Sequence, residues 1–272
     1  SVAIHVPVLA RVEGEGALDL RIEDGDIREL RLRIFEPPRF FEKFLEGRHY
    51  TEIPDLVARI CGICPVAYQV TAAHALERLY NVELSSWAHA MRRVFYCGEW
   101  IESHALHVYM LHAPDFLGYQ DVVELAATHR DAVLRALRLK KIGNQLVTVL
   151  GGREIHPVGA CVGGFHRVPE KAELAALQAD LEWALEASLD TVKLTASLPC
   201  PDFEADYEFV ALHHEQEYAM NEGRVVSNKG LDIDAIDFEE HSQEQHVCHS
   251  NALHSVMKAR QSYMTGPLAR FN

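Results

Sequence analysis

Two cysteines in the stretch Ala58 to Tyr68, ARICGICPVAY, have the spacing of a metal-binding or redox pair. Cys61 and Cys64 are separated by a glycine and an isoleucine, and Pro65 follows directly. Because proline favours the first position of a helix, both thiols are expected at a helix N-terminus. The free backbone N–H groups and the helix dipole favour the thiolate there, which is the form that binds metals and acts as a nucleophile.

Four interpretations of this pair fit its spacing. A thioredoxin-like dithiol needs a βαβ context, whereas the surrounding pattern is helical. A zinc site needs two further ligands at matched spacing, and the remaining cysteines form no second CxxC. The third interpretation is a buried structural pair, and the fourth is half of a soft-metal site that is completed elsewhere. These other cysteines are Cys97, Cys161, Cys200 and Cys248.

The pattern around the pair predicts an α+β fold, mainly α, with a long-helix bundle and a small N-terminal antiparallel sheet lobe. Residues 17–34 alternate apolar and polar side chains on either side of Asp24-Gly25, which predicts a hairpin. A second hairpin is expected near residues 218–227. No repeat or linker divides the chain, so we expect a single domain over residues 1–272.

Helical periodicity follows in several segments, which supply the expected bundle. The short ones run from 39 to 46 and from a cap at Thr51 to Arg59. The longer ones are expected from Pro65 to Tyr80, from Ser86 to His112, where Pro114 ends it, and from Asp121 to Leu150. A last one, from Pro169, carries an apolar stripe that we expect to be buried: Leu174, Leu177, Leu181, Leu185, Leu189 and Val192.

Composition excludes several classes of function. The formal net charge of −14 argues against nucleic acid, because phosphate binding needs a basic face. No run of 18 apolar residues predicts a membrane span, and the N-terminus does not resemble a secretory signal. Six irregularly spaced cysteines do not suggest a secreted disulfide framework, so a reduced, cytoplasmic protein is expected.

Several stretches in order resemble the large subunits of nickel–iron hydrogenases. The first CxxC lies in RICGICP, and ARVEGEG (10–16) resembles the entry strand of that family. PRFFEKFLEGR (38–48) resembles the stretch before the first CxxC. GGREIHPVGACVGGF (151–165) resembles the mid-chain segment, and YMTGPLARFN (263–272) resembles the late one. The overall similarity is to the cytoplasmic, NAD(P)-linked or sulfhydrogenase branch.

This resemblance implies an enzyme that reversibly oxidises dihydrogen to protons and electrons. It implies a nickel–iron centre whose iron carries diatomic ligands, and a magnesium ion. Electrons would pass to iron–sulfur clusters on a small partner subunit, and diaphorase-type flavin or nicotinamide subunits would follow. The chain itself has no ferredoxin-like cysteine run and no GxGxxG after a strand.

The resemblance also assigns residues. Cys61 would be a terminal nickel ligand, and Cys64 would bridge nickel and iron. Glu42 would bind the magnesium ion, although a solvated helical carboxylate is the ordinary interpretation. Glu13 would relay protons if burial lifts its pKa, and otherwise it is a surface residue at a strand end. Arg59 would lie near the metals, or form a surface ion pair.

Two departures from the family bear on these expectations. The family carries a second CxxC near its C-terminus, which residues 1–272 lack, so a missing segment or a companion chain is expected to complete the site. Tyr68 replaces a histidine that often follows the second cysteine, and the role of His156 is open between active-site and core histidine.

A scaffold like the quinone-site subunit of respiratory complex I and an inactive fragment are the alternatives, and both cysteines argue against the scaffold.

A histidine-rich stretch near residues 241–254 is interpreted as a polar surface or interface loop. It contains His241, His246, Cys248, His249 and His254. Sixteen histidines are spread through the chain, so this local density does not by itself indicate a zinc site.

Overall fold

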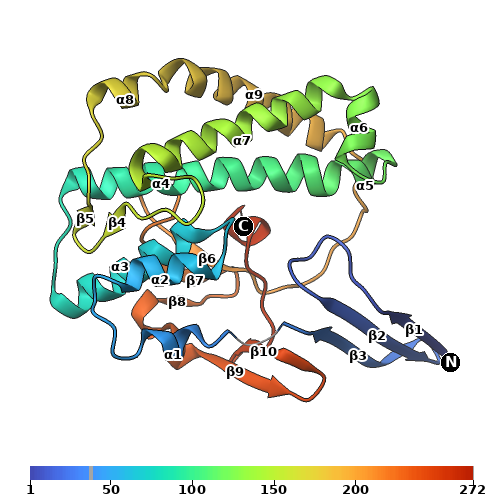
Figure 1. The fold of residues 1–272 in the computed structure, drawn as a ribbon. Helices are drawn as coiled ribbons and strands as arrows, with labels where there is room; N and C mark the ends of the chain where they lie inside the picture. Colours follow the sequence, from blue (N-terminus) through green and yellow to red (C-terminus); the bar gives the residue numbers. More distant parts are fainter. Residues whose placement is uncertain (37–38, 272) are drawn as a thin grey trace. The chain divides into compact units, whose positions relative to one another are not determined.

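The computed structural model describes residues 1–36 and 39–271, which form two compact units (Figure 1). The first unit combines Ser1–Arg39 with Phe203–Asn272, and the second is Phe40–Asp202. Pro38, the first residue of segment 38–48, and Asn272, the last residue of segment 263–272, lie outside the described residues. The expected mixture of helices with small antiparallel sheets is confirmed.

The first unit begins with a three-stranded antiparallel sheet of order β1-β2-β3. Its strands are β1 (Val2–Val6), β2 (Gly16–Glu23) and β3 (Asp26–Ile34). The predicted hairpin is confirmed, because β2 and β3 meet at Asp24-Gly25. Both turn residues have positive φ, 53° and 88°, the backbone that a tight two-residue hairpin requires. The pairing of β1 with β2 was not predicted.

The C-terminal part of this unit contains a second three-stranded sheet. Its strands are β6 (Val210–His213), β7 (Arg224–Ser227) and β8 (Asp232–Ile233). The predicted hairpin near 218–227 was misplaced, since the partner of Arg224–Ser227 is Val210–His213. The sheet buries a small apolar cluster: Val210, Val225, Leu231 and Met257.

The rest of the unit comprises a hairpin and short helical segments. Strands β9 (Ser242–Val247) and β10 (Ser250–Met257) pair with each other, so part of the histidine-rich stretch lies in strands. The helical segments are η3 (Ala235–Asp237), α10 (Phe238–His241) and α11 (Pro267–Phe271).

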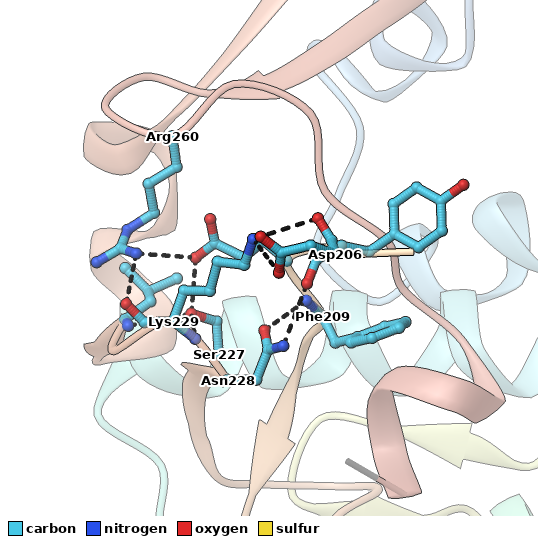
Figure 2. A network of polar contacts seen from close by, with 9 residues as sticks. Asp206, Phe209, Ser227, Asn228, Lys229 and Arg260 are labelled. Carbon is cyan, nitrogen blue, oxygen red and sulfur yellow. Dashed lines mark hydrogen bonds and ion pairs between the residues drawn. The ribbon is translucent and has the colours of Figure 1, made fainter. Parts of the chain in front are cut away.

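A polar network joins the second sheet to the residues that directly precede β6 (Figure 2). Glu208 is only 5% exposed and accepts a hydrogen bond from Ser227 Oγ at 2.7 Å. Arg260 pairs with the same carboxylate at 3.3 Å and donates to the Lys229 carbonyl at 2.6 Å. Lys229 in turn pairs with Asp206 at 2.7 Å. The buried carboxylate is thus satisfied by two other segments of this unit.

The second unit is mainly helical. Its early elements are α1 (Phe41–Leu45), α2 (Ile53–Val57), the 3₁₀ turn η1 (Ala58–Ile60) and α3 (Pro65–Tyr80). Then come α4 (Ser86–Ala105), the π-helical η2 (Leu106–His112), α5 (Ala113–Leu117), α6 (Val122–Thr128) and α7 (Arg130–Gly151). It ends with β4 (Ala160–Cys161), β5 (Gly164–Phe165), α8 (Lys171–Ala175) and α9 (Gln178–Ala196).

Several predicted helix boundaries were wrong. Glu52, rather than Thr51, precedes α2. The helix expected to stop before Pro114 continues through η2 into α5, where the proline occupies the first turn and needs no N–H partner. The helix expected from Asp121 to Leu150 is two helices, because the backbone of His129 leaves helical geometry at φ −120° and ψ 44°.

Helices α4 and α7 run side by side and cross at two glycines (Figure 1). A Cβ on Gly98 would lie 2.9 Å from Leu146 Cβ, and one on Gly143 would lie 2.6 Å from the Gly98 carbonyl oxygen. Only glycine therefore permits this separation of the two backbones. A core cluster of the unit lies between these helices and α9, and it includes Tyr109, Leu139 and Ile142.

The predicted stripe on α9 does not all face the core. Leu185, Leu189 and Val192 are 63%, 49% and 64% exposed, whereas Ala184 and Ala187 are buried. Ala184 and Ala187 pack with Leu139 and Ile142 of α7 in one buried cluster, so α9 packs along these alanines rather than along the whole predicted stripe. Within the described residues, no helix has the length and apolar character needed to cross a lipid bilayer.

Candidate metal centre

The CxxC pair connects η1 to α3. Cys61 is extended, at φ −142° and ψ 138°, and Cys64 occupies the position before the first helical residue, Pro65, as predicted. The backbone N–H of Cys64 donates to Cys61 Sγ at 3.2 Å. Both residues are half-buried, and neither thiol forms a disulfide. This hydrogen bond holds the Cys61 sulfur against the backbone that begins α3.

The mid-chain segment 151–165 lies against this loop. The His156 ring donates from Nδ1 to the Ala58 carbonyl, at 2.7 Å, one turn ahead of Cys61. A Cβ on Gly62 would contact the His156 ring at 3.9 Å, so the ring borders the loop itself. Farther along α3, the amide of Gln69 donates to the Pro157 carbonyl at 2.5 Å. His156 is therefore a neighbour of the cysteine loop as well as a hydrogen-bonded, half-buried residue.

A buried ion pair holds the other half of α3. Arg92 of α4 reaches Glu77 of α3 with two hydrogen bonds, of 2.7 and 2.5 Å, and the side chains are only 1% and 6% exposed. Glu77 also accepts from the Gly163 N–H at 2.7 Å, and Arg92 donates to the Cys161 carbonyl at 3.0 Å. The pair thus joins α3 and α4 to the β4–β5 hairpin.

A second buried carboxylate reaches the start of α3. Glu99 is 4% exposed, and its Oε2 accepts from the Val66 N–H at 2.6 Å. Burial raises the pKa of Glu99 from 4.5 to about 7, although the N–H groups of Val66 and Ala67 act in the opposite direction. Glu102, one turn along α4, adds a like charge that also raises this pKa. Lys140 of α7 pairs with Glu102 at 2.8 Å.

These charged residues of α4 were not identified from the sequence, although a signal for them exists. Ala88, Arg92, Phe95, Glu99 and Glu102 recur at intervals of three and four, and all are buried. Charged residues that share a helical stripe with core residues are rarely solvated, so the pattern indicates buried partners.

The other residues assigned by resemblance are exposed. Arg59 ends η1, two residues before Cys61; desolvation raises the pKa of Asp55 nearby, and Arg59 partly offsets that shift. Glu42 lies on α1, which has no buried residue. Glu13 lies in the other unit, between Arg11 and Gly14, which both have positive φ. Their roles stay predictions.

The donor set around Cys61 fits half of a soft-metal site. Two half-buried thiols lie together, and no group of three or more histidine, cysteine, aspartate or glutamate side chains in the described residues has the geometry to hold a metal ion. Tyr68, which the sequence resemblance marked as a departure, lies on the first turns of α3 and is 37% exposed. The thiols are the soft donors that nickel and iron accept.

Comparison with known proteins gives consistent relatives. Residues 39–133, which include the CxxC loop and α4, match the family model described as nickel-dependent hydrogenase. The chain is 33% identical over 269 residues to the alpha subunit of sulfhydrogenase 1 from Pyrococcus furiosus, covering 98% of this chain and 63% of that protein. It is 32% identical over 218 residues to one subunit of the F420-non-reducing hydrogenase from Methanothermobacter marburgensis, covering 77% and 45%.

Among solved structures, an NAD⁺-reducing [NiFe]-hydrogenase in the H₂-reduced state superposes with a TM-score of 0.89 at 29% identity. The match covers 99% of this chain and 66% of that one. The chain therefore spans less than two thirds of the curated relatives that it matches. In sequence and in fold, the chain is similar to subunits of nickel-dependent hydrogenases.

Proposed function

We propose that this chain forms part of the catalytic subunit of a nickel–iron hydrogenase, which reversibly oxidises dihydrogen to protons and electrons. The observation that carries the proposal is the CxxC loop at the start of α3, where Cys64 N–H donates to Cys61 Sγ. This loop lies inside the matched region of a chain that is homologous to hydrogenases along nearly its whole length.

Cys61 and Cys64 would hold the nickel–iron centre as its thiolate ligands. When bound, the nickel–iron centre supplies the reversible splitting of dihydrogen. The chain would contribute the two thiolates, and the N–H of Cys64 donates to the Cys61 sulfur. The segment that contains His156 encloses one side of the loop through its bond to Ala58.

Further roles follow from the same proposal. Glu13 would carry protons away from the centre, and Arg59, two residues before Cys61, would act close to the metals. Glu42 would contribute a carboxylate oxygen to a magnesium ion, a hard cation that prefers such ligands. Because the described residues offer only two cysteines at the loop, two further thiolates would come from outside residues 1–272.

The proposed enzyme is NAD(P)-linked and works in a complex. Similarity to an NAD⁺-reducing [NiFe]-hydrogenase supports diaphorase-type partner subunits, and an iron–sulfur small subunit would receive the electrons first. The described residues include all six cysteines and no disulfide, which suits the reducing conditions of the cytoplasm. The retained cysteine pair disfavours a purely scaffolding role.

Metal analysis of the complex purified through this chain tests the proposal, with the companion chains identified by mass. We expect nickel and iron together, and hydrogen oxidation with an artificial electron acceptor. The isolated chain should retain no stoichiometric nickel, because two thiolates leave the soft coordination sphere half filled. A complex that lacks both metals would refute the proposed function.

Cysteine variants test the ligand assignment. Cys64→Ser should abolish nickel incorporation and activity, because a neutral hydroxyl is a poor substitute for a bridging thiolate. Cys97→Ser and Cys200→Ser are the controls, and both should retain most of the activity. Equal damage from Cys97→Ser and Cys64→Ser would show that the wrong cysteine has been assigned.

A further inference from the structure

Glu99 is a buried carboxylate that the proposed chemistry does not use. It projects from α4 and is 4% exposed. Its neighbour Glu102 is paired with Lys140, whereas Glu99 Oε2 accepts from the backbone N–H of Val66 at 2.6 Å. The Ala67 N–H also acts on the same carboxylate. The groups that stabilise its charge therefore include the first turn of α3, directly after the cysteine loop.

The first turn of α3 needs such a partner. Helices leave their first N–H groups without intrahelical acceptors. Pro65 has no N–H, and Cys64, which precedes it, makes no side-chain capping bond. Val66 is fully buried, so solvent does not serve its N–H. An unmet buried donor would destabilise the turn, and Glu99 removes this penalty.

The backbone that carries Glu99 is itself tightly held. Gly98 precedes it, and there α4 meets Gly143 of α7 so closely that a Cβ would not fit. Because the backbone at this crossing is fixed, the Glu99 side chain has little freedom to follow α3 if that helix moves. Its bond to Val66 therefore fixes α3 relative to the α4–α7 pair.

We propose that Glu99 is a positioning residue for the Cys61–Cys64 loop, because its carboxylate anchors the first turn of α3 and thereby the backbone that carries both thiols. This inference rests on the proposed function, in which these thiols bind nickel and iron. Loss of the anchor should free the backbone N–H of Cys64 and loosen its bond to Cys61 Sγ.

The test uses the full metal-free chain and the variants Glu99→Ala and Glu99→Gln. Hydrogen exchange at Val66 should accelerate roughly 10- to 100-fold in Glu99→Ala, because a buried donor is left without its acceptor. Glu99→Gln retains an amide oxygen that accepts the bond, so it should restore part of the protection. His104→Gln is the control, at an exposed residue of the same helix, and it should leave Val66 unchanged.

Alkylation provides a second measurement that a loss of overall stability would not reproduce. The ratio of Cys61 to Cys64 labelling should shift in Glu99→Ala and return toward wild type in Glu99→Gln, with exposed Cys200 as the reference. Unchanged Val66 exchange and an unchanged ratio in both variants would overturn the proposal, as would the same effects from His104→Gln. Nickel content of the purified complex is measured separately: wild-type complex without nickel refutes the metal role rather than the anchor.

Discussion

The Glu77–Arg92 pair offers a sharp test of what holds the cysteine-bearing helix in place. Both side chains are almost fully buried, and two hydrogen bonds of 2.7 and 2.5 Å join them. Each also has a backbone partner in the β4–β5 hairpin. We consider Arg92→Met and Glu77→Met separately, and then the double variant.

The structure predicts different effects for the single and double variants. Removing one partner leaves the other charge buried and uncompensated, which should lower the free energy of unfolding by about 3–5 kcal/mol. Removing both replaces a buried ion pair with apolar side chains of similar size, which by itself is often close to neutral. The hairpin groups at Cys161 and Gly163 stay unpaired in the double variant, so a loss of about 1–3 kcal/mol should remain.

Urea unfolding of the full chain, followed by circular dichroism, measures the three variants as a double-mutant cycle. Lys193→Met removes an exposed ion pair with Asp190 and is the control, which should leave the unfolding curve essentially unchanged. The reasoning is refuted if the double variant loses as much stability as the two single variants added together. It is also refuted if either single variant unfolds like Lys193→Met.

Three further predictions concern other buried or assigned carboxylates. Because the pKa of Glu99 is raised from 4.5 to about 7, its contribution to stability is complete below pH 4.5 and is lost as the pH rises through about 7. The unfolding free energy of Glu99→Gln should therefore fall less than that of wild type between about pH 5 and about pH 8, and parallel urea series would contradict this. The assembled hydrogenase with Glu13→Gln should keep its metals, but its rates of hydrogen oxidation and of deuterium exchange with solvent should fall by roughly 10²- to 10⁴-fold. Wild-type rates would show that Glu13 is an ordinary surface residue. Glu208→Ala should lower the free energy of unfolding by about 1–3 kcal/mol in urea titrations. This loss should be smaller than that of the Arg92 variant, because the side chain of Arg260 is 31% exposed and stays hydrated. A loss equal to that of the Arg92 variant would contradict this explanation.

Features that depend on neighbours in the sequence were predicted well. The helix begins at Pro65 because proline presets the backbone angle of a first helical residue. The hairpin turns at Asp24-Gly25 because these residues tolerate positive φ. The placement of Cys61 and Cys64 at a helix start was also local, whereas their sharing of one metal stays a prediction. Resemblance in the same order along the chain then indicated the family.

The partners of that helix could not be predicted in the same way. Glu99 and Arg92 reach α3 across 33 and 15 residues, and His156 reaches Ala58 across 98. Such contacts depend on how closely two helices approach. The glycines at the α4–α7 crossing permit a close approach, but only where the two helices meet. The sequence by itself therefore determined where the thiols are and which backbone presents them. Only the tertiary structure decided which buried charges hold that backbone, because an ion pair or a cap forms between surfaces that folding brings together.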